Sequence, residues 1–273
     1  MHGLKDNYDF AFSIGGACAC SQTLRRAGMQ FASFPLDWVG KYPSVTFVAE
    51  LISKDFAGLL VREKMIDCGP NPDNDMEIYR NGETGIYFLH DFRKGGNFEL
   101  DYPIIEEKYR RRAERFAAFM KRSGRVLAVY VSVPNREEPK AADLLSARDL
   151  IALKYPDAEV DLLWFSQLKD VAFEPSNIER LNNHVFRAAF DFQAAHAPNI
   201  ADDKVLAPVL RSLVKSVRDY RTAEQKAGYK IAARQKKYAL YKAKSFWQYQ
   251  RNKFYYKLFK HFKNRLERSG FKF

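Results

Sequence analysis

The segment that most constrains the fold is RVLAVYVSV, residues 125–133, a continuous run of apolar and β-branched residues. This pattern is typical of a strand buried on both faces, because a half-exposed strand alternates apolar and polar residues. Such a strand needs a layer of helices on each side. We expect one helix to begin near Asp101 and Pro103 and end at Ser123-Gly124, and another in SARDLIALKYP (146–156), before a strand in AEVDLLWFS (158–166).

The same alternation of strand and helix extends along the chain. We expect further strands in YDFAFSI, TGIYFLH and VFRAAFDF, and helical segments in SQTLRRAG, SVTFVAELISKDFAGLL and SNIERLNNH. The pattern predicts an α/β domain over residues 1–205, with a mainly parallel sheet and helices on both faces. In this class, sites gather at the carboxyl ends of strands, and Cys18 and His90 both fall at predicted carboxyl ends.

The positive charge is concentrated at one end of the chain. Residues 211–273 carry 19 Lys and Arg against 3 acidic residues, whereas the remainder carries 26 against 30. We expect a basic, aromatic-rich helical tail over 206–273. The first interpretation is that its aromatic stripe packs on the domain or on a second copy, as in a homo-oligomer. The second is that residues 211–273 bind an anionic membrane surface, and the third is that they bind nucleic acid.

The remaining composition indicates a reducing compartment. The chain has three cysteines, Cys18, Cys20 and Cys68, which is too few for a disulfide framework and an odd number. We find neither a signal peptide nor a run of about 18 apolar residues. We therefore expect a cytoplasmic protein, with the tail as a means of peripheral attachment to the inner membrane. The cysteine spacing does not match paired zinc ligands, and no glycine segment has phosphate-loop spacing, so neither a metal nor a cofactor is expected.

Cys18 lies where the strand-to-helix turn could activate a thiol. Free backbone N–H groups and the positive end of a helix favour thiolate over thiol, which predicts a lowered pKa, and the same N–H groups could stabilise an oxyanion. A histidine at a neighbouring strand end, such as His90, could act as base and then acid. The alternative is a structural cysteine in a glycine turn with an unrelated histidine, and the residue pattern by itself favours it.

Several separated motifs favour the catalytic interpretation. The segments SIGGACACSQTLRRAGMQFASFPLDW, FLHDF and EKYRRRAERF, in this order, resemble the bacterial family of papain-like cysteine peptidases otherwise described as a domain of unknown function. The resemblance covers roughly residues 8–130. It implies a Cys/His site with acyl chemistry through a thioester, in a surface-glycan context. The sequence departs from the family at Leu36, where a phenylalanine is usual.

The resemblance places Cys18 as the nucleophile and His90 as the base. Asp37, in the PLDW segment, is the first candidate to orient His90, although a turn or capping role is equally open. Asp91 ranks lower because it would point to the other side of the strand. Cys20 is expected to pack.

Other residues are candidates for substrate contacts. Ser13, Gly15 and Gly16 belong to the turn before Cys18, Trp38 follows Asp37, and Asp91 follows His90. Arg111, in the YRRRAERF run, could hold an anion, although i,i+4 pairs with Glu favour a solvated helix face.

Two function classes follow from these observations. The first is an enzyme, a cysteine hydrolase or acyltransferase acting on an acyl- or peptide-bearing substrate that is linked to a glycan. The second is a binding protein that holds an anionic glycan or a lipid-linked precursor without turnover. A thiol pKa well below that of free cysteine would favour the enzyme, and an unreactive thiol would favour the binder.

Overall fold

The computed structural model describes residues 3–4, 7–15, 18–40, 44–72, 74–194, 197–221, 223 and 226. The chain divides into a first compact unit, Met1–Asp219, and a second, Tyr220–Phe273. The first unit therefore extends beyond residue 205, where we expected the domain to end. The basic tail expected over 206–273 lies, beyond residue 226, outside the described residues.

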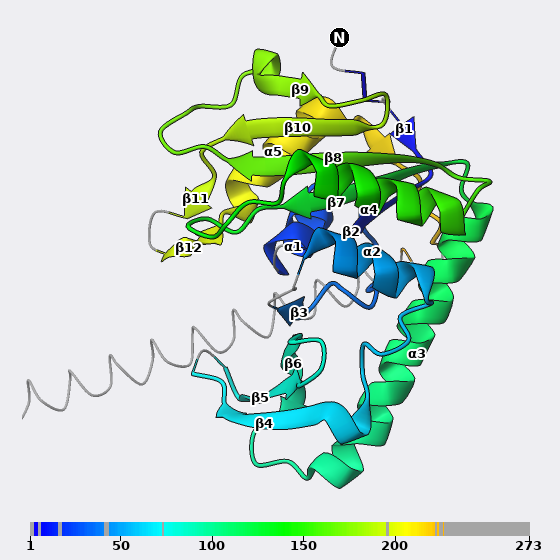
Figure 1. Cartoon of the computed structure of the whole chain (residues 1–273), viewed down its shortest axis with the longest axis vertical. Coiled ribbons are helices and arrows are strands. Elements are labelled where there is room, and N and C mark those ends of the chain that lie inside the picture. Colours follow the sequence, from blue (N-terminus) through cyan, green and yellow to red (C-terminus); the bar gives the residue numbers. More distant parts are fainter. Residues whose placement is uncertain are drawn as a thin grey trace, which may run out of the picture. The chain divides into compact units, whose positions relative to one another are not determined.

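A five-stranded sheet forms the centre of the first unit (Figure 1), in the order β2-β7-β8-β10-β9. Its four parallel strands are β2 (Phe10–Ser13), β7 (Arg125–Val131), β8 (Glu159–Gln167) and β10 (Val185–Phe190). The edge strand β9 (Ile178–Arg180) is antiparallel to β10. The prediction of a mainly parallel sheet is thus confirmed, although SNIERLNNH contributes a strand where a helical turn was expected.

Helices cover both faces of this sheet, which explains the unbroken apolar run of β7. Val126 and Ala128 belong to one core cluster, whereas Leu127 and Val129 belong to the other, because successive strand residues point to opposite faces. The first cluster includes residues of α2 (Val45–Ser53), α3 (Phe98–Arg122) and α4 (Ala141–Lys154). The second includes residues of α1 (Cys18–Arg26) and α5 (Asp203–Leu213).

Helix α3 starts earlier than the sequence suggested. The Asn97 side chain accepts hydrogen bonds from the N–H groups of Glu99 and Leu100, so it caps the helix and satisfies two free donors. Pro103 therefore lies inside the helix rather than at its first position. Ser123 ends it, as expected.

A second sheet, antiparallel and four-stranded, was not predicted. Its order is β3-β6-β5-β4, and its strands are β3 (Val39–Gly40), β4 (Met65–Pro70), β5 (Met76–Asn81) and β6 (Tyr87–Arg93). Glycine, proline and asparagine at both ends of MEIYRN made this stretch look like a loop. His90 lies within β6, so the expectation that it ends a strand of the parallel sheet is wrong.

Short elements complete the first unit. They are β1 (Asn7–Tyr8), β11 (Gln193–Ala194), β12 (Ala197–Ala201), β13 (Ser216–Val217) and the 3₁₀ turns η1 (Arg62–Lys64) and η2 (Pro175–Asn177). β13 pairs with β1 in parallel, so the chain after α5 returns to the domain instead of continuing as one helix. Within the described part of the chain, no helix combines the length and apolar character needed to cross a membrane.

Candidate functional site

Cys18 lies at the carboxyl edge of the parallel sheet. It is the first residue of α1, which follows β2 after a turn. In that turn Gly15 has a φ of +126°, a conformation that favours glycine, and its N–H donates to Ser13 Oγ at 3.3 Å. Ser13 and Gly15 therefore shape the turn, and both are buried. Gly16, the third residue expected here, lies outside the described residues.

The electrostatics of the Cys18 thiol differ from the sequence expectation. Burial raises the pKa of the thiol and is the largest effect. The backbone N–H groups of Cys18 and Ala19 lower the pKa, as a helix start should, and the negative charge of Asp203 raises it. The net shift is upward, so the expected lowered pKa is wrong for this structure, and the half-buried thiol is protonated at rest.

Cys20 is a packed residue, as expected. Its side chain is fully buried, and its Sγ donates to the carbonyl oxygen of Val129 at 3.2 Å. Burial raises the pKa of this thiol to about 12. Cys68 is exposed in β4, and all three cysteines are free.

Asp37 holds the segment after α1 against that helix. Its side chain is 1% exposed, and its carboxylate accepts from Ser21 Oγ at 3.0 Å, Gln30 Nε2 at 2.7 Å, Phe34 N at 2.8 Å and an Arg25 nitrogen at 3.3 Å. Ser21 and Arg25 are four residues apart, so they share one face of α1. Among the described residues, no hydrogen bond joins Asp37 to His90.

A chain of ring contacts leads from α1 to His90. The Arg25 guanidinium lies 5.4 Å from the centre of the Trp38 ring, and the His90 ring meets Trp38 edge to face with 5.9 Å between centroids. The structure thus brings PLDW and His90 together beside the helix that begins with Cys18. Sequence reasoning missed Arg25. Its signal was the spacing of seven residues from Cys18, which is two helical turns along one face.

His90 and Asp91 point to opposite sides of β6. The His90 residue is exposed, whereas the Asp91 side chain is 2% exposed and faces α3. Asp91 accepts from Tyr109 Oη at 2.8 Å and forms an ion pair with Lys108. Asp91 therefore fastens β6 to α3. In the part of the chain that the structure describes, Cys18 and His90 share no hydrogen bond.

The arginine run on α3 lies largely in solvent. Arg111 is exposed and forms an ion pair with Glu107 at 3.7 Å. Arg110 pairs with Glu107 at 2.7 Å and also with Glu114. These i,i+3 and i,i+4 pairs are what a solvated helix face shows. Among the described residues, no contact joins Arg111 to another predicted site residue.

Two hollows lie in the first unit near these elements. One, of about 260 Å³, is at the carboxyl end of β7, the strand beside β2, and Tyr130, Val133 and Glu138 are among its lining residues. Glu138 is fixed there, because it accepts from Ser166 Oγ at 2.5 Å and from Gln167 N at 2.6 Å. This hollow is at the same edge of the sheet as Cys18.

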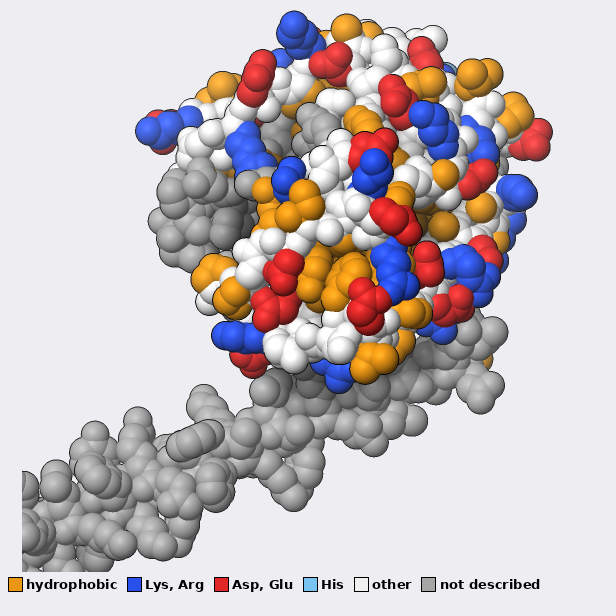
Figure 2. Space-filling model, turned by 60° about the horizontal axis from the view of Figure 1, so that its bottom comes forward, with side chains coloured by type: hydrophobic (Ala, Val, Ile, Leu, Met, Phe, Trp, Pro, Cys, Tyr) orange, Lys and Arg blue, Asp and Glu red, His pale blue; other side chains and the backbone are white. Residues whose placement is uncertain are grey.

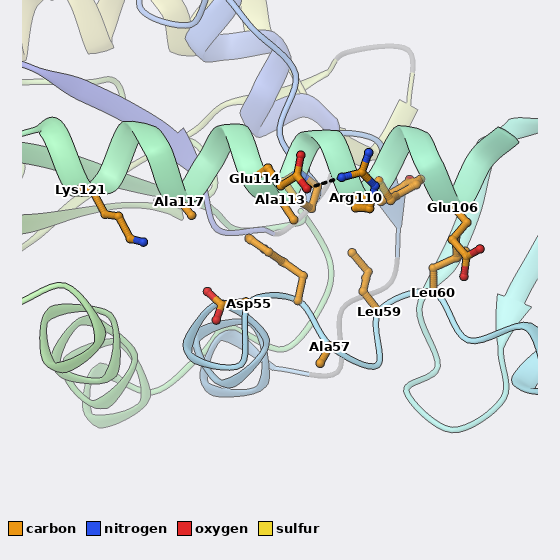
Figure 3. A pocket seen from close by; sticks show the side chains of 13 residues that line it. Asp55, Ala57, Leu59, Leu60, Glu106, Arg110, Ala113, Glu114, Ala117 and Lys121 are labelled. Carbon is orange, nitrogen blue, oxygen red and sulfur yellow. Dashed lines mark hydrogen bonds and ion pairs between the residues drawn. The ribbon is translucent and has the colours of Figure 1, made fainter. Parts of the chain in front are cut away.

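The other hollow is an apolar groove between α3 and residues 55–60. Leu59 and Ala113 are among its apolar lining, and the Arg110–Glu114 pair lies on its α3 side (Figure 3). Apolar side chains also gather on one face of the molecule with charged side chains around them (Figure 2). None of the predicted site residues lines the groove.

Comparison with known families agrees with this arrangement. A family model described as "Putative papain-like cysteine peptidase (DUF1796)" matches residues 9–152, just over half of the chain. The match includes Cys18, the Asp37-Trp38 pair and His90. No curated protein and no solved structure matches the chain. The chain therefore belongs to the family that this model describes, DUF1796.

Proposed function

We propose that the protein is a cysteine-dependent hydrolase or acyltransferase, with Cys18 as nucleophile and His90 as general base and acid. The observation that supports this most is the place of Cys18. It is the first residue of α1 at the carboxyl edge of the parallel sheet, where its own N–H and that of Ala19 act on the sulfur. Sites in this fold class gather at that edge.

The chemistry follows the general course of thiol acyl transfer. His90 takes the thiol proton, and the sulfur of Cys18 attacks the acyl carbon of the substrate. The N–H groups of Cys18 and Ala19 stabilise the oxyanion. The leaving group takes the proton back from His90 as the thioester forms. Water then releases the acid, or an acceptor hydroxyl or amine takes the acyl group.

In this proposal the thiol and the imidazole are apart until substrate binds. Burial raises the pKa of Cys18, so the thiol is protonated until the imidazole approaches. Catalytic hydrogen bonds are often made only when substrate is bound. Trp38 contacts His90 and Arg25, so it is placed to set the position of the imidazole. Asp37 acts through Arg25 in this proposal, as a positioning residue rather than as the direct partner of His90.

The substrate side of the proposal rests on the family resemblance. We propose an acyl- or peptide-bearing group on a surface-glycan precursor, held in the hollow beside Tyr130 and Glu138 at the end of β7, the strand next to β2. The basic residues of 211–273 would hold the protein at an anionic membrane surface.

The test is labelling of Cys18 by a fluorescent acyl-type electrophile. The full chain with Cys68→Ser removes the exposed thiol, and Cys18→Ser in this background should abolish labelling. His90→Gln should slow labelling at least about a hundredfold, the low end of what a general base supplies. Lys154→Gln, which changes an exposed ion pair with Asp55, is the matched control and should label normally. Labelling of His90→Gln at the rate of the parent would refute the assigned role of His90.

One observation favours a second candidate, a non-catalytic binding protein. The raised pKa of Cys18 is what an unreactive, structural thiol would have. The two candidates differ in the pH dependence of alkylation with substrate analogue present. The enzyme requires the thiol pKa to fall when the site is occupied, whereas a binder leaves it raised and binds in a salt-sensitive manner.

A further inference from the structure

Three side chains capable of metal ligation converge at the amino edge of the parallel sheet. Glu159, Asp161 and His184 each offer one ligand atom, and these atoms lie within 4.8 Å of one another. Glu159 and Asp161 are two residues apart in β8, so they point to the same face of the sheet. His184 precedes β10, and its carbonyl oxygen accepts from Leu162 N of β8 at 2.8 Å. Two neighbouring strands therefore fix the cluster.

Asp161 is the buried member of this cluster. Its side chain is 2% exposed, and its two oxygens lie 2.7 Å from Tyr8 Oη and 2.9 Å from His184 Nδ1. Within the described ranges, His184 is its sole ion-pair partner. A buried carboxylate is costly unless a positive charge is close to it.

We propose that Glu159, Asp161 and His184 bind a divalent transition-metal ion of the Zn²⁺ type. Two carboxylate oxygens and one imidazole nitrogen form a ligand set of intermediate hardness. The imidazole favours Zn²⁺ over Mg²⁺ and Ca²⁺, which prefer oxygen ligands only. Separations of up to 4.8 Å need only a small inward movement of the side chains to bring three ligands to about 2.0–2.2 Å from one ion.

The surroundings of the cluster suit this role. Tyr8 Oη holds one oxygen of Asp161, as outer groups commonly do for ligating carboxylates. The His184 side chain is 33% exposed, and Glu159 and Tyr8 also line a hollow of about 610 Å³. An ion can therefore enter from solvent, and water can fill the position that three protein ligands leave open.

This site is separate from the proposed catalytic site. Cys18 follows the carboxyl end of β2, whereas Glu159 begins β8, and the two strands run in the same direction through β7. The two sites therefore lie at opposite ends of the parallel strands. Metal binding would connect the starts of β8 and β10, and its test is independent of any activity at Cys18.

The test is calorimetric titration of the full chain with Zn²⁺ at neutral pH. A Cys18→Ser/Cys68→Ser background removes the two thiols that are not buried and could bind the ion on their own. Two ligand variants, His184→Gln and Glu159→Gln, are compared with His90→Gln, which changes an exposed histidine elsewhere. Circular dichroism confirms that each variant is folded. The melting temperature measured with and without Zn²⁺ provides a second readout, because an ion that binds the native state stabilises it.

We expect one Zn²⁺ ion per chain, with affinity reduced at least about tenfold in His184→Gln and in Glu159→Gln. His90→Gln should bind as the background does, and Mg²⁺ should not compete. The proposal is overturned if the background chain binds no Zn²⁺. It is also overturned if the two ligand variants bind with unchanged affinity and the same rise in melting temperature.

Discussion

The Asp37 carboxylate provides the sharpest test of how the candidate site is held together. In the structure it is almost fully buried and accepts four hydrogen bonds, three of them from groups that are themselves buried: Ser21 Oγ, Gln30 Nε2 and the backbone N–H of Phe34. Replacing Asp37 with alanine leaves these donors without their acceptor. The sequence alone left open whether this residue orients a histidine or stabilises a turn.

The cost of Asp37→Ala can be worked out donor by donor. Each buried donor left unpaired costs about 1–1.5 kcal/mol, so three cost about 3–5 kcal/mol. Arg25 adds nothing to this sum, because its side chain is 32% exposed and water can replace the carboxylate. For a domain of this size, the melting temperature should fall by about 6–20 °C. Asp37→Asn keeps one acceptor oxygen and should cost about 2 kcal/mol.

The assay is chemical and thermal unfolding followed by circular dichroism. Asp55→Asn is the matched control, because Asp55 is 63% exposed and its ion pair with Lys154 should be worth no more than about 1 kcal/mol. If Asp37→Ala unfolds at the same denaturant concentration and temperature as the parent, the hydrogen bonds described for Asp37 do not stabilise the native state. The structural account of the PLDW segment would then be incorrect.

Two further predictions concern thiol reactivity and the link between β6 and α3. In the native protein, iodoacetamide should modify exposed Cys68 first, half-buried Cys18 more slowly and buried Cys20 last, as followed by peptide mass spectrometry. Because burial raises the pKa of Cys18, its rate should keep rising with pH above the ordinary cysteine range; a plateau at neutral pH would contradict this. Tyr109→Phe removes a hydrogen bond to Asp91 and should lower the unfolding free energy by about 1 kcal/mol, measured by urea titration, with no change expected if the bond is absent in solution.

The parallel sheet could be predicted from sequence because its strands are short apolar runs. Val126 to Val131 show no alternation, and this pattern has few interpretations other than a strand covered on both faces. The antiparallel sheet could not be predicted in the same way. The residues of β5 are partly buried on both faces and lie between Gly, Pro and Asn residues, so neither alternation nor an apolar run marks the strand. His90 was assigned to the wrong sheet for this reason.

The members of the candidate site stay a prediction, and their contacts could not be predicted from the sequence. The motifs indicated Cys18, Trp38 and His90, and the structure links the last two by a ring contact. What Asp37 binds depends on donors from α1 and the following loop, which no local pattern reveals. The balance that raises the pKa of Cys18 could not be read from sequence either, because it depends on how much protein surrounds the turn.

The zinc site that we propose could not be predicted from motifs either, because its ligands are not all close in sequence. Glu159 and Asp161 are two residues apart in β8, but His184 lies just before β10, the next strand in the sheet, beyond a long connection. Only the register of β8 against β10 brings the three together, with Leu162 opposite Val185.

The order of strands in the central sheet also determines whether the segment that the family model matches could be produced on its own. That segment ends at residue 152, yet β7 pairs along its whole length with β8, which begins at Glu159. A piece excised at residue 152 would expose seven residues of unpaired backbone beside a bare apolar surface, the kind of edge that recruits other chains into aggregates. A stable piece would therefore have to include β8, which pairs with that edge in the full chain.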